Sequence, residues 1–127
     1  MKVIHHDQAQ RIEPQTGWSR ASLCVEDGVS VEHFTKPPHH ASPMHHHHNA
    51  QVCVVIQGAM IVRLEDGTEE RMEPGSACFF PPNEPHQVVN ALDVPSVGIE
   101  IFVPGRSFDF WIKKMEEGTW DFGGDKS

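Results

Sequence analysis

Histidine is the residue type in this sequence that most strongly suggests chemistry. Ten of the 127 residues are histidines, and four of them are consecutive, from His45 to His48. Imidazole nitrogens are common ligands of divalent transition metals. Side chains alternate between the two faces of a β-strand, so in a strand His45 and His47 would share one face and His46 and His48 the other. Only one of the two pairs could therefore face a common pocket.

The histidine run belongs to the first of two regularly spaced segments. The first reads His45-x-His47-x3-Gln51-x6-Gly58, and the second reads Gly75-x5-Pro81-x-Asn83-x2-His86-x3-Asn90. A tight hairpin after the run would place Gln51 beside one of the two histidine pairs. A third imidazole, from His86, would have to be brought to the same point by a separate strand.

Short β-strands must position these residues. Ten glycines and ten prolines are spread along the chain and separate segments rich in β-branched and aromatic residues, which is typical of an all-β domain. The predicted strands are Arg20–Val25, Val29–Lys36, Pro43–His48, Val52–Gln57, Ala59–Leu64, Glu69–Met72, Ala77–Phe80, His86–Asn90 and Val97–Val103. Apolar residues at helical spacing predict one short helix over Ser107–Glu117, capped by Ser107 and ended at Gly118.

The two spaced segments resemble the two conserved motifs of the cupin family. The sequence departs from the family pattern at three positions: His39 and Asn83 stand where the motifs have glycine, and Gln51 stands where the first motif has glutamate. Asparagine tolerates the left-handed backbone conformation that glycine would supply. The resemblance implies a jelly-roll barrel of antiparallel strands with a metal inside.

The resemblance also implies a ligand set of His45, His47, Gln51 and His86 for one divalent transition metal, which could be Mn, Fe, Co, Ni or Zn. The other pair, His46 and His48, would put Gln51 off the family spacing. Three imidazoles and one amide are all neutral ligands, so the ion would keep its full charge and act as a strong Lewis acid.

The last predicted strand carries a second group of chemically interesting residues. Alternation puts Glu100 and Phe102 on one face of this strand, and a carboxylate in a core strand needs a partner or a wet cavity. Together with Arg106, these residues are similar to the Asp-x-Phe-x3-Arg pattern of small cupins that convert unsaturated uronates from pectin or alginate into linear keto forms. The resemblance implies that Glu100 is a general acid or base, that Arg106 grips the substrate carboxylate in bidentate fashion, and that Phe102 packs on the sugar.

These residues favour an enzyme of carbohydrate metabolism that acts on a small anionic substrate as an isomerase or lyase. The alternatives are a cupin of the hydroxynitrile-lyase type, an iron dioxygenase, and a small-ligand-binding cupin without activity. A plain ion pair between Glu100 and Arg106 at the rim of the barrel is the structural alternative to a catalytic role.

Length, charge and cysteine count limit the organisation and the partners. We expect one domain, with residues 1–28 as N-terminal strands that could be exchanged in a homodimer, 29–106 as the cupin barrel, and 107–127 as a short helix with a frayed tail. The formal net charge of −8 argues against nucleic acid, and no segment is apolar enough for a membrane. Three cysteines, an odd number, and the lack of an apolar leader predict a cytoplasmic protein with free thiols.

Overall fold

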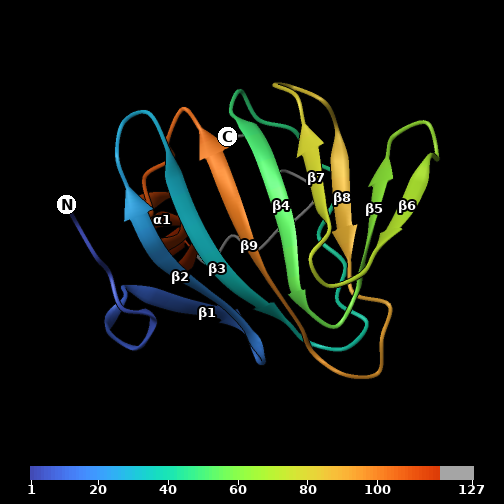
Figure 1. The fold of residues 1–127 in the computed structure, drawn as a ribbon, viewed down its shortest axis with the longest axis horizontal. Helices are drawn as coiled ribbons and strands as arrows, with labels where there is room; N and C mark the ends of the chain where they lie inside the picture. Colours follow the sequence, from blue (N-terminus) through green and yellow to red (C-terminus); the bar gives the residue numbers. More distant parts are fainter. Residues whose placement is uncertain (118–127) are drawn as a thin grey trace.

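The computed structural model describes residues 1–117, which form two antiparallel sheets that face each other and one short helix (Figure 1). The six-stranded sheet has the order β1-β2-β3-β9-β4-β7, and the three-stranded sheet has the order β6-β5-β8. The strands are β1 (Arg11–Gln15), β2 (Trp18–Val25), β3 (Ser30–Lys36), β4 (Ala50–Gln57), β5 (Met60–Leu64), β6 (Glu69–Met72), β7 (Ala77–Phe80), β8 (His86–Val89) and β9 (Ser96–Val103). A single turn of 3-10 helix spans His6–Gln8, and α1 spans Asp109–Glu117.

The predicted all-β architecture is confirmed, with β1 as a strand missing from the prediction and two further differences in the elements. The segment 43–48, predicted as a strand, makes only an isolated bridge between His45 and His86. The carbonyl of His47 instead accepts a hydrogen bond from the loop residue Asn83 at 2.8 Å, so the ladder does not continue. The helix begins at Asp109 rather than Ser107, whose hydroxyl accepts the Asp109 N–H at 3.2 Å. The predicted helix end at Gly118 and the frayed tail lie outside the described residues.

Two apolar clusters hold the fold together. The first lies between the sheets and contains Phe34, Cys53, Val55, Met60, Val62, Met72, Phe80 and Val88. The second joins α1 to the first two strands and contains Ile12, Trp18, Phe108 and Trp111. The helix therefore covers one end of the sheet pair, where the indole ring of Trp111 packs edge-on against that of Trp18. Within the described part of the chain, no helix combines the length and the apolar character needed to cross a bilayer.

Gly98 lies where strand β4 and the Phe34 ring leave no room for a side chain. A Cβ atom at this position would lie 2.6 Å from the Val54 carbonyl oxygen and 2.7 Å from the Phe34 ring. We therefore expect Gly98→Ala to lower the free energy of unfolding by about 1–3 kcal/mol, as overpacked core positions do. Urea unfolding would measure this change. Gly28→Ala is the matched control, since a Cβ there meets nothing within 4 Å, and equal stability of the two variants would contradict the tight packing at Gly98.

Candidate metal centre and substrate pocket

Three histidine side chains converge between the two sheets. His45 and His47 come from the loop before β4, and His86 is the first residue of β8. Their ligand atoms all lie within 4.8 Å of one another. The backbones of His45 and His86 exchange hydrogen bonds of 3.0 and 2.9 Å, which fix the two side chains next to each other. His46 and His48 are not part of this group.

Backbone carbonyls set the tautomer of each ring. The Nδ1 atoms of His45, His47 and His86 lie 2.7, 2.9 and 2.9 Å from the carbonyl oxygens of Pro43, Asn49 and Glu84. A carbonyl oxygen only accepts hydrogen bonds, so each Nδ1 carries the proton and donates it. Each Nε2 is then left with a lone pair. His86 Nε2 is buried and has no hydrogen-bond partner among residues 1–117, so its lone pair is free to bind a cation.

Gln51, at the start of β4, brings an oxygen to the same point. Its Nε2 donates to Glu100 Oε2 at 2.7 Å, and this bond turns its Oε1 toward His47 Nε2 at 2.8 Å. With Nδ1 of His47 protonated, both of these atoms are acceptors, and two lone pairs at this distance repel unless a cation lies against both. Three imidazole nitrogens and one amide oxygen are a donor set that suits a divalent transition metal, so the residues present fit such an ion.

Burial keeps the histidines in the neutral form that binds metals. Desolvation, together with the nearby imidazoles of His45 and His47, lowers the pKa of His86 to about 4. Desolvation also lowers the pKa of His47. A metal ion would therefore not have to displace protons from these two rings at neutral pH.

A buried network of charges forms the wall opposite the histidines. Glu100 of β9 lies 3.4 Å from the Arg20 guanidinium of β2, and Arg20 also contacts Glu32 of β3 at 2.8 Å. Burial by itself would raise the pKa of Glu100, but the positive charges of Arg20 and Arg106 outweigh it and lower the pKa to about 2. Glu100 is thus an ionised carboxylate that is hydrogen-bonded directly to Gln51.

Arg106 lies beside this network rather than alone at the rim. Its Nη2 lies 3.3 Å from Glu32 Oε2, and its guanidinium carbon lies 4.0 Å from the centre of the Phe102 ring. Glu32 also accepts a hydrogen bond of 2.8 Å from the indole N–H of Trp111. The direct ion pair between Glu100 and Arg106, the structural alternative to a catalytic role, is replaced by pairs that run through Arg20 and Glu32. A bidentate grip of Arg106 on a substrate carboxylate stays a prediction, and it would require Arg106 to release Glu32.

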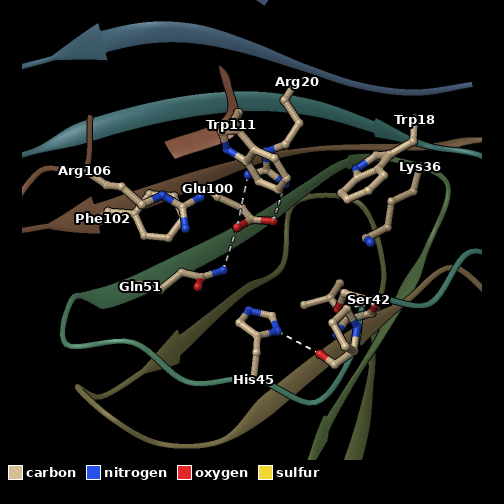
Figure 2. A pocket seen from close by; sticks show the side chains of 12 residues that line it. Trp18, Arg20, Lys36, Ser42, His45, Gln51, Glu100, Phe102, Arg106 and Trp111 are labelled. Carbon is tan, nitrogen blue, oxygen red and sulfur yellow. Dashed lines mark hydrogen bonds and ion pairs between the residues drawn. The ribbon is translucent and has the colours of Figure 1, made fainter. Parts of the chain in front are cut away.

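A pocket opens between the charged network and His45 (Figure 2). Its cavity volume is about 40 Å³, which is room for a few water molecules, so a sugar-sized ligand would also occupy the open mouth. The predicted residues His45, Gln51, Glu100, Phe102 and Arg106 all line it. The other lining residues are Trp18, Arg20, Lys36, Ser42, Pro43, Val88 and Trp111.

A family comparison agrees with this geometry, since the cupin domain pattern matches residues 32–102. The chain belongs to the cupin family. A Bacillus subtilis protein named H2HPP isomerase is 32% identical over 93 residues, which are 72% of this chain and 39% of that protein. This cupin therefore spans about two fifths of the length of that curated relative.

Solved cupin structures have the same fold. KdgF from Halomonas sp. is 26% identical with a TM-score of 0.75 over 87% of this chain and 97% of the other. An RmlC-like cupin from Shewanella frigidimarina is 22% identical with a TM-score of 0.75 over 87% and 96%. The polyketide cyclase RemF from Streptomyces resistomycificus is 22% identical with a TM-score of 0.68 over 81% and 79%. The predicted family and jelly-roll fold are confirmed.

Sequence reasoning missed Arg20 and Lys36, which line the pocket of this cupin, and Glu32, which pairs with Arg20 and Arg106 behind the pocket wall. Glu32 could have been found, because it is a carboxylate in a strand that alternates between buried and half-buried positions, as Glu100 is. Arg20 and Lys36 are buried at 4% and 2% exposure. Both read as ordinary polar residues at the ends of strands, and no spacing in the sequence connects them with the histidines.

Acid is expected to destabilise the metal-free cupin. The pKa values of His86 and His40 lie at about 4, below the ordinary 6.5, chiefly because of burial. As the pH falls from 6.5 toward 4, the unfolded chain binds protons that the folded chain does not, so stability is lost. Below pH 4.5 Glu100, with its pKa of about 2, acts in the same direction. We expect Tm in the presence of a chelator to fall by roughly 10 °C between pH 7 and pH 4.5, and a Tm that does not change over this range would contradict the burial of the two rings.

Proposed function

We propose that this cupin is a metal-dependent enzyme that opens the ring of a small unsaturated uronate and releases its linear keto form. The observation that carries the proposal is the contact between Glu100 and Gln51. It places an ionised, desolvated carboxylate 2.7 Å from the amide whose oxygen faces His47. A base is thus held beside a Lewis-acid site in one pocket. The resemblance of Glu100, Phe102 and Arg106 to uronate-converting cupins, and a relative named as an isomerase, support the same assignment.

The chain's own residues supply proton transfer, positioning and exclusion of water. Ring opening removes the proton of the hydroxyl on C1 and breaks the bond from C1 to the ring oxygen, which leaves with the electron pair as an enolate. Protonation of the enolate on carbon then gives the ketone. Glu100 is ionised, since its pKa is about 2, and so has a free site for the first proton. The low pKa makes it a weak base that returns the proton readily in the second step.

Other pocket residues hold the substrate in place for this transfer. The aromatic ring of Phe102 offers a flat surface for the sugar. The buried Nε–H of Arg106 has no hydrogen-bond acceptor within the described part of the chain, so a substrate oxygen can accept from it. Held by His45, His47, Gln51 and His86, a divalent metal would polarise the substrate oxygens it binds. The covering indoles of Trp18 and Trp111 limit the access of water.

The direct test is turnover of an unsaturated monouronate by the metal-loaded protein. The conjugated double bond of the substrate absorbs in the ultraviolet, so its loss reports the reaction, and the keto product can be verified by NMR. We expect activity that disappears with a chelator and returns with a divalent metal. No turnover with any of the five metals Mn, Fe, Co, Ni and Zn would refute the proposed reaction.

A second candidate follows from the curated relative. The 32% identity to a protein named H2HPP isomerase favours isomerisation of H2HPP, a reaction that the same base and metal site could perform. Incubation of the metal-loaded protein with H2HPP, followed by its absorption spectrum, separates the two candidates. Turnover of H2HPP without turnover of the uronate would replace the first assignment.

A further inference from the structure

Lys36 is a buried cation on the pocket wall to which neither the sequence motifs nor the proposed reaction assigns a role. It is the last residue of β3 and is 2% exposed. Its Nζ lies 3.0 Å from His40 Nδ1 and 5.5 Å from the centre of the Trp18 ring. Figure 2 shows this amine directed into the pocket between Trp18 and Ser42, across from Arg106 and Phe102.

The charges of the pocket balance without Lys36. The carboxylates of Glu32 and Glu100 face the guanidinium groups of Arg20 and Arg106, which pair two negative with two positive charges. Among residues 1–117, no ion pair joins Lys36 to a carboxylate. The pocket therefore carries one positive charge more than its own acids neutralise.

Lys36 keeps this charge at neutral pH. Burial lowers its pKa, the charge of Glu100 raises it, and the charge of Arg20 lowers it, with a result of about 8. Burial and the charges of Lys36 and Arg20 lower the pKa of His40 to about 4, so that its neutral ring accepts a hydrogen bond from the ammonium. An ammonium has three donors, and this bond uses one of them.

We propose that Lys36 binds the carboxylate of the substrate at the end of the pocket remote from Arg106. A buried ammonium without a carboxylate partner is unfavourable in the empty pocket, and an anionic group that enters the pocket relieves this cost. The remaining ammonium donors can form charge-assisted hydrogen bonds with carboxylate oxygens. Lys36 is thereby a residue that selects acids over neutral molecules of the same shape. The inference rests on the proposed function only in placing the substrate in this pocket, and it holds for any carboxylate substrate.

The test compares two sugars, of which one carries a carboxylate, and three proteins: the wild type and two variants that each lack one lysine charge. D-Galacturonate carries a carboxylate where D-galactose carries a hydroxymethyl group. Calorimetry measures binding of both sugars to the wild type, to Lys36→Met and to Lys2→Met, each saturated with the same divalent metal. Lys2→Met removes the same charge at an exposed site, where Lys2 pairs with Glu26.

We expect the wild type and Lys2→Met to prefer galacturonate over galactose. Lys36→Met should bind galacturonate roughly 10- to 100-fold more weakly, because it loses hydrogen bonds to a charged group, and should bind galactose unchanged. Its Tm should equal or exceed that of the wild type, since methionine fills a similar volume without a buried charge.

Three results would overturn the inference. If Lys36→Met loses affinity for both sugars equally and has a lower Tm, Lys36 is a structural residue. Unchanged affinity of Lys36→Met for galacturonate would place the carboxylate on the metal or on Arg106. Failure of the wild type to prefer galacturonate would show that the pocket does not select acids. These results are separate from a failure of the proposed reaction, which appears as absent turnover and not as absent binding.

Discussion

The variant His86→Ala is expected to bind divalent metals at least roughly 100-fold more weakly than the wild type. Loss of a residue that only supports a ligand costs about 10- to 100-fold in metal affinity, and His86 would be a ligand itself. Its Nε2 is buried, unpartnered and grouped with the ligand atoms of His45 and His47. Competition with a chromogenic chelator measures the affinity for each metal.

His48→Ala is the matched control for this experiment. His48 belongs to the same histidine run but is exposed and lies outside the group of three. We expect it to bind metal as the wild type does. The metal should also raise the Tm of the wild type and of His48→Ala, but not that of His86→Ala, because a ligand stabilises only a fold that binds it. Equal affinities of His86→Ala and His48→Ala would mean that the exposed run, and not the interior site, collects the metal.

The sequence predicts those parts of the site that lie close together along the chain or follow a fixed spacing. His45, His47 and Gln51 lie within seven residues of one another. The residue type also indicates where the backbone must adopt the left-handed conformation. Asn83 adopts a φ of 65°, as expected for a residue that stands in place of glycine. His39, at the other position where the motif has glycine, adopts a φ of 59°. Both positions keep the left-handed conformation of the motif without keeping its glycine.

The charged wall of the pocket depends on strand register, which the sequence does not specify. Glu32 lies directly opposite Glu100 across β3 and β9, and like charges at such positions repel. Arg20 reaches both carboxylates from β2, because β2 pairs with the other edge of β3. A composition or a motif cannot reveal that two acids on separate strands meet, so the cation that must lie between them cannot be predicted either.

The second large effect is expected for Glu100→Gln, which should lower kcat on the unsaturated uronate by roughly 10²- to 10⁴-fold, the usual contribution of a general acid or base. Glutamine has nearly the same shape, and its carbonyl oxygen can still accept the hydrogen bond that Gln51 Nε2 gives to Glu100. The variant therefore removes the basic group while leaving the neighbouring amide in place. Rates are measured at saturating metal, so that a change in metal affinity does not contribute.

Glu100→Asp separates the role of the charge from the role of the position. Aspartate is the residue of the uronate-converting pattern at this site, and it keeps an ionised carboxylate beside Arg20. If Glu100 transfers the proton, Glu100→Asp should retain much more activity than Glu100→Gln. The exposed change Glu26→Gln should have no effect on the rate, since Glu26 lies at the surface, where it pairs with Lys2. If Glu100→Gln and Glu100→Asp lose stability and activity equally, the carboxylate serves as the counter-ion of Arg20, and the base must be sought elsewhere in the pocket.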